Sequence, residues 1–133
     1  MGILDRLLNE IKDISVKLDE AYVNDWLTLM GATHALQVQS QALIDIIERL
    51  LANMGISVMG YRDAAVKLRE LGLLNDEEYR FLLTVIGFRN IVIHEYTSVD
   101  FNLVRGILSR REYRRLLELA LKLRERAKNY WDP

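Results

Sequence analysis

Apolar residues recur at spacings of three and four along most of the chain, which is the pattern of amphipathic helices. The first run extends from Ile3 to Leu18 and predicts a helix. Its apolar positions are Ile3, Leu4, Leu7, Leu8, Ile11, Ile14 and Leu18. The tripeptide "VND" at 23–25 breaks this pattern and supplies an N-cap, Asn24 or Asp25, for the helix that follows.

A second and longer helix is predicted from Trp26 to Met54. The positions expected to face a core are Leu36, Leu43, Ile47, Leu50 and Met54. Gly55 comes next, and glycine is well suited to the left-handed residue that ends many helices. Roughly 28 residues would span about 40 Å, a length that is typical of a helix bundle.

The stretch "GISVMGY" at 55–61 predicts a loop, and a short helix follows it and stops at Gly72. The inward positions of the short helix are Ala64, Ala65, Leu68 and Leu71. The tetrapeptide "NDEE" then has the form of a capping box, in which Asn75 accepts from first-turn amides and Glu78 reaches back. A fourth helix is therefore predicted to begin at Asp76. It carries Phe81, Val85 and Phe88 inward.

The last predicted helix follows Asp100, a suitable N-cap, and ends near Tyr130. Within it, "SRRE" at 109–112 has the form of a second capping box. The apolar spacing also slips between Leu108 and Tyr113. A kink in this helix is therefore predicted.

These patterns predict an all-α fold, an antiparallel bundle of four long helices plus one short helix, in a single domain of residues 1–133. One segment has an alternative, because the β-branched residues of "NIVIHEYTSV" at 90–99 could form a strand. No other segment of the chain offers this strand a partner, so the helix is favoured.

Composition excludes several classes of protein. Half of the 133 residues are apolar and 28% are charged, which is ordinary for a globular protein. Charges interrupt every apolar run before it reaches the length of a membrane span, and they interrupt the N-terminal segment "MGILDRLLNE" before it resembles a signal peptide. With no cysteine and two histidines, the sequence predicts a cytoplasmic protein with no disulfide, metal site or cofactor.

The net charge is −1, but the basic residues are unevenly distributed. Nine of the 18 lie in segment 105–128, where three glutamates oppose them. The nine are Arg105, Arg110, Arg111, Arg114, Arg115, Lys122, Arg124, Arg126 and Lys128. This charge fits either a solvated helix face or a surface that binds phosphates, and the sequence leaves both interpretations open.

Four polar side chains flank an apolar run in "GFRNIVIHEY" at 87–96: Arg89, Asn90, His94 and Tyr96. On a straight helix Arg89 and Tyr96 lie on nearly the same side, whereas Arg89 and His94 are about 140° apart. Either the helix loosens before His94, or a working site combines residues from two copies of the chain around a two-fold axis.

Arginine and histidine together suit the cleavage of a phosphodiester without a metal. A neutral His94 can take a proton from a ribose 2′-OH or give one to the leaving oxygen. Arg89 can hold the phosphate as negative charge builds up, and Asn90 can orient His94 or bind the sugar-phosphate. In the structural alternative, Arg89 forms a surface ion pair, His94 caps the helix and Tyr96 packs its ring. Spacing alone favours that alternative.

The segment "FRNIVIHEY" resembles the R-x4–6-H motif of the HEPN superfamily, and in particular the pattern R-N-x-x-x-H-x-Y of its HepT-type toxins. Segments 35–55 and 61–78 also resemble the helices that precede the motif in that branch. The resemblance implies an all-helical homodimer that cuts RNA without a metal in its dimer cleft. It also implies a cognate nucleotidyltransferase antitoxin, as in type VII-like toxin–antitoxin pairs.

By the same resemblance, Arg89 and His94 correspond to the catalytic pair, Asn90 to the polar residue after the arginine, and Tyr96 to the tyrosine that the antitoxin adenylylates. At 33–34 the chain has "TH" where relatives are expected to carry arginine, so His34 is either a substitute or a surface residue. Two acidic residues of the second helix, Asp45 and Glu48, could support Arg89 or simply form a polar face. Both tryptophans, Trp26 and Trp131, are expected to pack.

Two other functions fit the same sequence. The chain could be a non-catalytic helical module that binds a nucleotidyltransferase partner, or a helical dimerisation domain. The dimerisation domain requires none of the four polar residues. Their presence together favours the ribonuclease.

Overall fold

A computed structural model describes residues 2–94 and 100–132 of the chain. Within these ranges the protein contains six α-helices, one short 3-10 helix and no strand. The helices are α1 (Ile3–Glu20), α2 (Trp26–Asn53), α3 (Tyr61–Glu70), α4 (Asp76–His94), α5 (Phe101–Ser109), α6 (Arg114–Arg126) and η2 (Lys128–Tyr130). The prediction of an all-α fold is confirmed.

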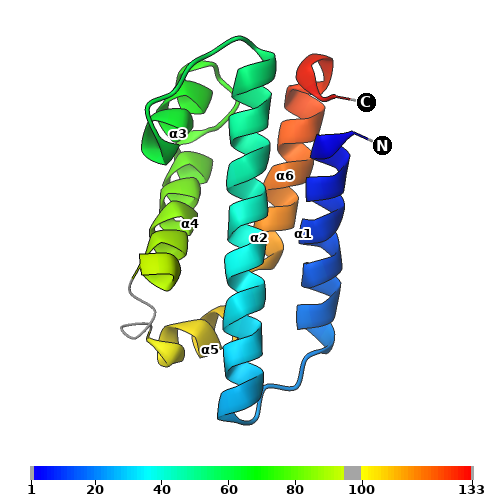
Figure 1. Cartoon of the computed structure of the whole chain (residues 1–133), viewed down its shortest axis with the longest axis vertical. Coiled ribbons are helices and arrows are strands. Elements are labelled where there is room, and N and C mark those ends of the chain that lie inside the picture. The colour runs from blue at the N-terminus through cyan, green and yellow to red at the C-terminus, as the bar shows by residue number, and fades with distance from the viewer. Residues whose placement is uncertain (1, 95–99, 133) are drawn as a thin grey trace.

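The four longer helices α1, α2, α4 and α6 lie side by side with alternating directions, and α2 packs against each of the other three (Figure 1). The short α3 lies at the end of the bundle where both termini are found, whereas α5 crosses the opposite end (Figure 1). No helix among the described residues is both long and apolar enough to cross a membrane.

The predicted starts and stops of the middle helices are confirmed. Asp25 caps α2 by accepting from the backbone N–H of Thr28 at 2.8 Å. Gly55 has a φ of 75°, and the amide of Ile56 donates to the Leu51 carbonyl, so α2 ends in the left-handed motif that its glycine predicts. Gly72 ends α3 in the same way, with a φ of 76°.

The capping box at the start of α4 is also confirmed. The amide of Glu78 donates to the Asn75 side chain at 2.8 Å, and the amide of Asn75 donates to the Glu78 carboxylate at 2.9 Å. Arg126 of α6 donates to the same carboxylate at 2.7 Å, and Lys122 lies 3.7 Å from it. Burial raises the pKa of Glu78, but these hydrogen bonds and charges outweigh it and the net pKa is lowered.

The prediction of a single C-terminal helix from Asp100 to Tyr130 is wrong, because this segment forms two helices, α5 and α6. Asp100 does cap α5, accepting from the amide of Asn102 at 2.9 Å. At the break Arg111 has a φ of 54°, and a left-handed residue ends an α-helix. The predicted second capping box does not form, since the Ser109 hydroxyl donates to the Gly106 carbonyl and α6 has no side-chain cap.

The core consists of two clusters. The larger one joins α1, α2, α3, α4 and α6, and the smaller one joins the end of α1 and the start of α2 to Val104 and Tyr113. At the level between them, the fully buried Gln39 donates to the Ile11 carbonyl at 3.0 Å and to the Ser15 hydroxyl at 2.8 Å. A buried polar contact between α1 and α2 therefore lies at the boundary between the two apolar clusters.

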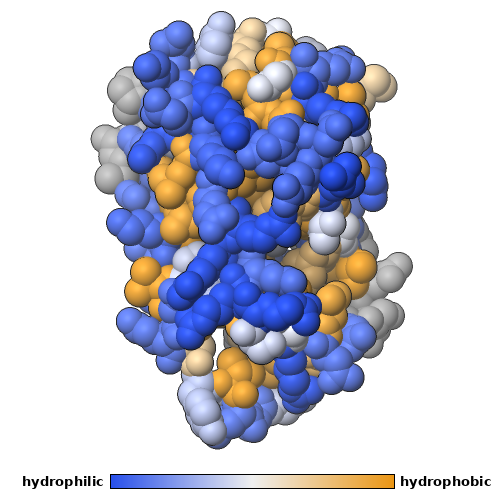
Figure 2. All heavy atoms as spheres, turned by 180° about the vertical axis from the view of Figure 1, so that it is seen from behind, coloured by the Kyte–Doolittle hydropathy of each residue, from blue (hydrophilic) through white to orange (hydrophobic). Residues whose placement is uncertain are grey.

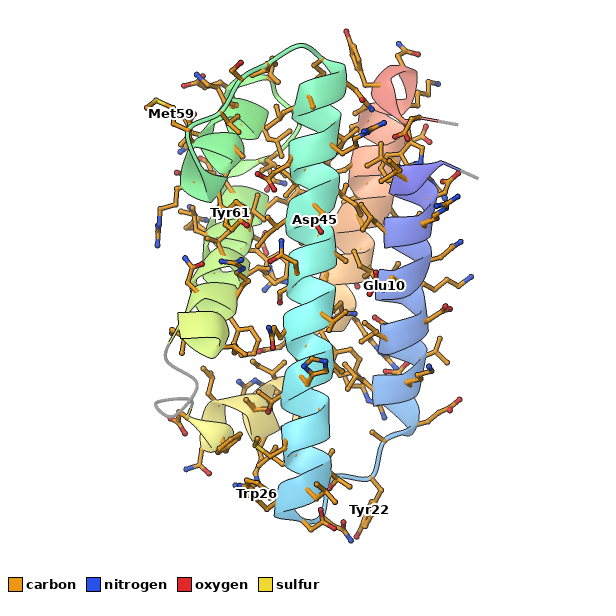
Figure 3. The ribbon with its side chains drawn as sticks, in the orientation of Figure 1. Glu10, Tyr22, Trp26, Asp45, Met59 and Tyr61 are labelled. Atoms are coloured by element: carbon orange, nitrogen blue, oxygen red, sulfur yellow. The ribbon has the colours of Figure 1, made fainter. Side chains whose placement is uncertain are left out.

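Three individual packing predictions have mixed outcomes. The partly buried Trp131 packs against the larger cluster and donates its indole N–H to Asp5 at 2.8 Å, so the prediction that it packs is confirmed. Trp26 is 64% exposed, so the prediction that it packs is wrong. It is the first residue of α2, where the cap at Asp25 directs the chain into solvent at the end of the bundle (Figure 3). Leu71 is likewise exposed, because α3 has already ended at Glu70.

Candidate active site

Arg89 lies in the last third of α4 and is half-buried against α2. Its Nε–H donates to the side-chain oxygen of Gln41 on α2 at 2.8 Å. Its NH1 donates to the side-chain oxygen of the adjacent Asn90 at 3.1 Å. Both acceptors are neutral amides, so they fix the guanidinium in place without neutralising its charge.

A third side chain, Tyr61, restrains the same guanidinium from α3. The Arg89 guanidinium carbon lies 5.0 Å from the centre of the Tyr61 ring, within the range of a cation–π contact. Tyr61 is the first residue of α3 and lies on the side of α2 where α3 and α4 pack (Figure 3). Three helices thus meet at Arg89.

Polar residues on α2 form a row beside this arginine: Gln41, Asp45 and Glu48, at spacings of four and three. Such spacings place side chains on one side of a helix. Gln41 also donates its amide N–H to Asp45 at 2.8 Å, which leaves its oxygen turned toward Arg89. The carboxylate of Asp45 therefore orients Gln41, and Gln41 orients Arg89.

Burial raises the pKa of Glu48, and the nearby Asp45 carboxylate raises it further, while Arg89 acts in the opposite direction. The positive field of Arg89 thus reaches Glu48. No direct ion pair joins Arg89 to a carboxylate among the described residues.

Arg89 retains donors for a ligand. A guanidinium has five N–H groups, and two of those of Arg89 are used by Gln41 and Asn90. The other three have no hydrogen-bond acceptor among the described residues. A fixed guanidinium with free donors can bind an anion such as a phosphate bidentately.

The other motif residues are only partly placed. Asn90 contacts Arg89 as described, whereas the side chain of His94 and the whole of Tyr96 lie outside the described residues. The backbone of α4, however, is helical through His94. The alternative in which the helix loosens before His94 is therefore excluded, and Arg89 and His94 stand about 140° apart around one helix axis.

Sequence reasoning did not identify Gln41 or Tyr61 as partners of Arg89. The spacing of Gln41, Asp45 and Glu48 on one side of α2 was a usable signal, but it does not say which helix faces that side. His34 is exposed on α2. No three His, Asp or Glu side chains of residues 2–94 and 100–132 gather where they could hold a metal ion.

The fold and this site define an all-α bundle protein with an arginine held in place where three helices meet. The sequence model of the Ribonuclease HepT-like family matches residues 4–123, which is most of the chain. The protein therefore belongs to the HepT-like ribonuclease family of the HEPN superfamily. No curated protein matches the sequence. The family membership supports a HEPN-type ribonuclease function with RNA as the substrate.

Proposed function

We propose that this protein is a metal-independent endoribonuclease toxin, in which Arg89 and His94 cut RNA in a cleft between two copies of the chain. Membership of the ribonuclease family supports the reaction class. The observation that carries the proposal is the Arg89 guanidinium, which is fixed by Gln41, Asn90 and Tyr61 and has three N–H groups without an acceptor among the described residues.

In the proposed reaction, Arg89 binds the non-bridging oxygens of the scissile phosphate and stabilises the charge that builds up on them. The ribose 2′-oxygen attacks phosphorus while a neutral His94 accepts its proton, and the bond to the 5′-oxygen breaks. A protonated His94 returns a proton to that leaving oxygen. The products are a 2′,3′-cyclic phosphate and a 5′-hydroxyl.

The proposed dimer follows from the geometry of α4. Since the helix is continuous to His94, its own Arg89 and His94 diverge by about 140°. Two α4 helices around a two-fold axis would bring Arg89 of one copy toward His94 of the other, and would form two such pairs, one on each side of the axis.

The proposed regulation acts through Tyr96. A cognate nucleotidyltransferase antitoxin would transfer an adenylyl group to its hydroxyl. Because Tyr96 follows Arg89 by seven residues, a helix continued to that point would place the two on nearly the same side. The added phosphate would then compete with RNA for the Arg89 guanidinium.

Substitution of the pair tests the reaction. We expect Arg89→Ala and His94→Ala each to lower the rate of RNA cleavage by about 10²-fold or more while the helical circular dichroism spectrum is unchanged. Cleavage by the unsubstituted protein should persist in EDTA. Cleavage that EDTA abolishes and magnesium restores would contradict the mechanism. If the protein forms a stable complex with a nucleotidyltransferase but cleaves no RNA, either alone or in that complex, the non-catalytic module would be favoured.

A further inference from the structure

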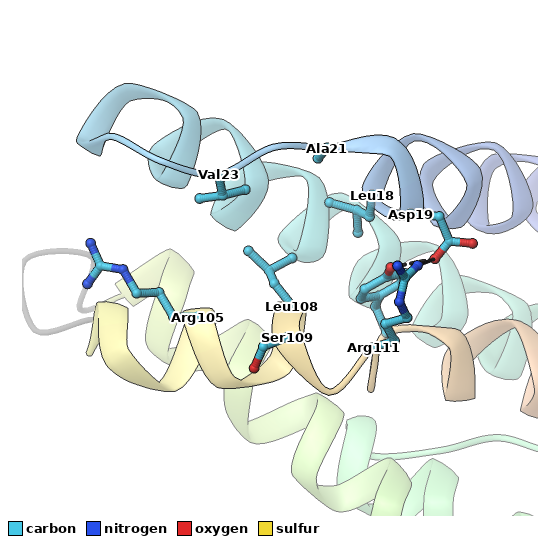
Figure 4. Close-up of a pocket in the computed structure, with 9 residues that line it drawn as sticks. Leu18, Asp19, Ala21, Val23, Arg105, Leu108, Ser109 and Arg111 are labelled. Atoms are coloured by element: carbon cyan, nitrogen blue, oxygen red, sulfur yellow. Dashed lines mark hydrogen bonds and ion pairs between the residues drawn. The ribbon is translucent and has the colours of Figure 1, made fainter.

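A pocket lies at the opposite end of the bundle from α3, between the end of α1, the loop that follows it and the α5–α6 turn (Figure 4). Its volume is about 310 Å³. Leu18, Val23 and Leu108 form its apolar floor, and Arg105, Ser109 and Arg111 lie around it. A pocket of this size is at the lower end of those that bind small molecules.

Among the described residues that line this pocket, Asp19 carries the one carboxylate, and it is already neutralised. Its oxygens accept from Arg111 at 3.0 Å, from Arg114 at 3.0 Å and from the Tyr113 hydroxyl. The hydrogen bond from Arg114 has the largest effect, and together with the one from Tyr113 and the other neighbouring charges it lowers the pKa of Asp19 to about 2. Two guanidinium groups, those of Arg111 and Arg114, thus hold this carboxylate, and Arg105 adds a third positive charge at the pocket, so the pocket is positive.

Arg105 is the least engaged of these cations. It is exposed, and its one hydrogen bond among the described residues is a long one of 3.4 Å to the side chain of Asn102. Within the described part of the chain no carboxylate lies at ion-pair distance from it. No described carboxylate therefore competes with an anionic ligand for its guanidinium.

Arg111 occupies a backbone position that does not favour arginine. Its φ of 54° is in the left-handed region, which glycine or asparagine adopts more readily. Arg111 is also not needed to neutralise Asp19, because Arg114 and the Tyr113 hydroxyl donate to the same carboxylate. The side chain remains 48% exposed beside the pocket. Strained residues of this kind concentrate at ligand sites.

Hydrophilic side chains dominate the face that lies behind α2 in Figure 1 (Figure 2). Arg110 and Arg115 are exposed near the α5–α6 turn, and both are paired with glutamates, Glu112 and Glu77. Among the described residues, the unpaired positive charge near this turn therefore lies at the pocket.

We propose that this pocket binds a nucleotide of single-stranded RNA, with the base against the apolar floor and the flanking phosphates on Arg105 and Arg111. The two guanidinium groups lie at opposite ends of the floor in Figure 4, as phosphates on either side of a nucleoside would require. Arginine suits both tasks, because it binds phosphate oxygens and is weakly hydrated. The inference rests on the proposed function in taking RNA as substrate, and adds a binding site separate from Arg89.

Fluorescence anisotropy with a labelled single-stranded octaribonucleotide, 2′-O-methylated so that it resists cleavage, tests this site. We expect Arg105→Ala and Arg111→Asn each to weaken binding about tenfold. Each should also reduce the slope of log affinity against log salt by about 0.7, the value for one single-strand phosphate contact. Asparagine tolerates the left-handed conformation, so Arg111→Asn preserves the turn.

Arg124→Ala is the matched control, since Arg124 is an exposed arginine about 15 Å further along α6 than Arg114. Equal affinities of Arg105→Ala, Arg111→Asn and Arg124→Ala would overturn the proposal. So would displacement of the probe by adenosine monophosphate as effectively as by unlabelled octanucleotide, because the pocket would then be a free-nucleotide site. Binding is measured without cleavage. A loss of affinity in Arg105→Ala and Arg111→Asn but not in Arg124→Ala would therefore support this site even if the proposed reaction failed.

Discussion

The two best-defined arginine sites of this protein treat the guanidinium charge in opposite ways. Arg89 donates to two neutral amide oxygens, those of Gln41 and Asn90, whereas Arg114 donates to the Asp19 carboxylate. A carboxylate partner cancels the charge that an anionic ligand would use, but an amide only orients it. The charge of Arg89 is thus oriented by its two partners but not cancelled by them.

Glu48 gives a prediction on pH. Burial raises the pKa of Glu48 above the ordinary value of 4.5. At pH values between the pKa of the unfolded chain and that of the folded protein, the folded protein binds more protons than the unfolded chain. Stability attributable to Glu48 therefore falls as the pH rises through this interval. We expect Glu48→Gln to have a larger free energy of unfolding than the unsubstituted protein near pH 7, and the difference to close near pH 4.

Urea unfolding at both pH values measures this difference. Glu10→Gln is the control, because it removes a carboxylate from an exposed position of α1. A Glu48→Gln variant that is less stable near pH 7 would show that attraction to Arg89 outweighs the cost of burying the charge.

Tyr96 gives a prediction on regulation. An unmodified phenol, with a pKa near 10, is a poor base at neutral pH, so the proposed chemistry does not need it. We expect Tyr96→Phe to retain ribonuclease activity and to resist inactivation by a nucleotidyltransferase partner with ATP. Intact-mass spectrometry should detect adenylyl groups on the unsubstituted protein alone. Modification of Tyr61 or Tyr113 with Tyr96 left free would contradict this role.

The sequence predicted the local part of the candidate site but not its neighbours. Arg89, Asn90 and His94 are close in sequence, and their motif made them candidates; the structure places the side chains of Arg89 and Asn90 in contact. Gln41 and Tyr61 contact Arg89 from helices that lie 48 and 28 positions away, and only packing brings them there. Their side chains alone carry no sign of which arginine they meet.

Among the helices, boundaries set by local chemistry were predictable and the break between α5 and α6 was not. Caps such as Asp25 and Asn75 act within one turn, so their sequence pattern is sufficient. The slip between Leu108 and Tyr113 signalled an irregularity. Its extent depends on the left-handed Arg111 and on the contact of Tyr113 and Arg111 with Asp19 of α1, which no local pattern reveals.

The start of α4 gives a prediction on stability. Asn75→Ala should lower the free energy of unfolding by about 1 kcal/mol, the usual effect of losing an N-cap. Glu78→Ala should cost more, about 2 kcal/mol, because it also removes the acceptor of Arg126. Chemical unfolding measures both. Glu77→Ala, at an exposed residue of the same turn, should change little, and an equal loss at Glu77 would show that the capping box is not the cause.

At the scale of the whole molecule, the proposed shared cleft predicts complementation. In a mixed dimer of Arg89→Ala and His94→Ala chains, one of the two cross-chain Arg89–His94 pairs would combine an intact arginine with an intact histidine. Refolding the two inactive variants together in equal amounts should therefore restore about a quarter of the activity, since half of the dimers are mixed. Light scattering should report about twice the chain mass of 15.5 kDa. A cleft built within one chain would restore no activity.

The buried amide of Gln39 has a consequence for how the bundle opens. It marks the level at which the core divides, and the smaller cluster on its far side holds α5 and the α5–α6 turn against the start of α2. Regions with a small core open at lower free energy than the rest of a protein. Backbone amides of α5 should therefore exchange with deuterium well before those in the middle of α2 and α6. The end of the molecule that carries the arginine pocket could adjust to a ligand while the larger core stays closed.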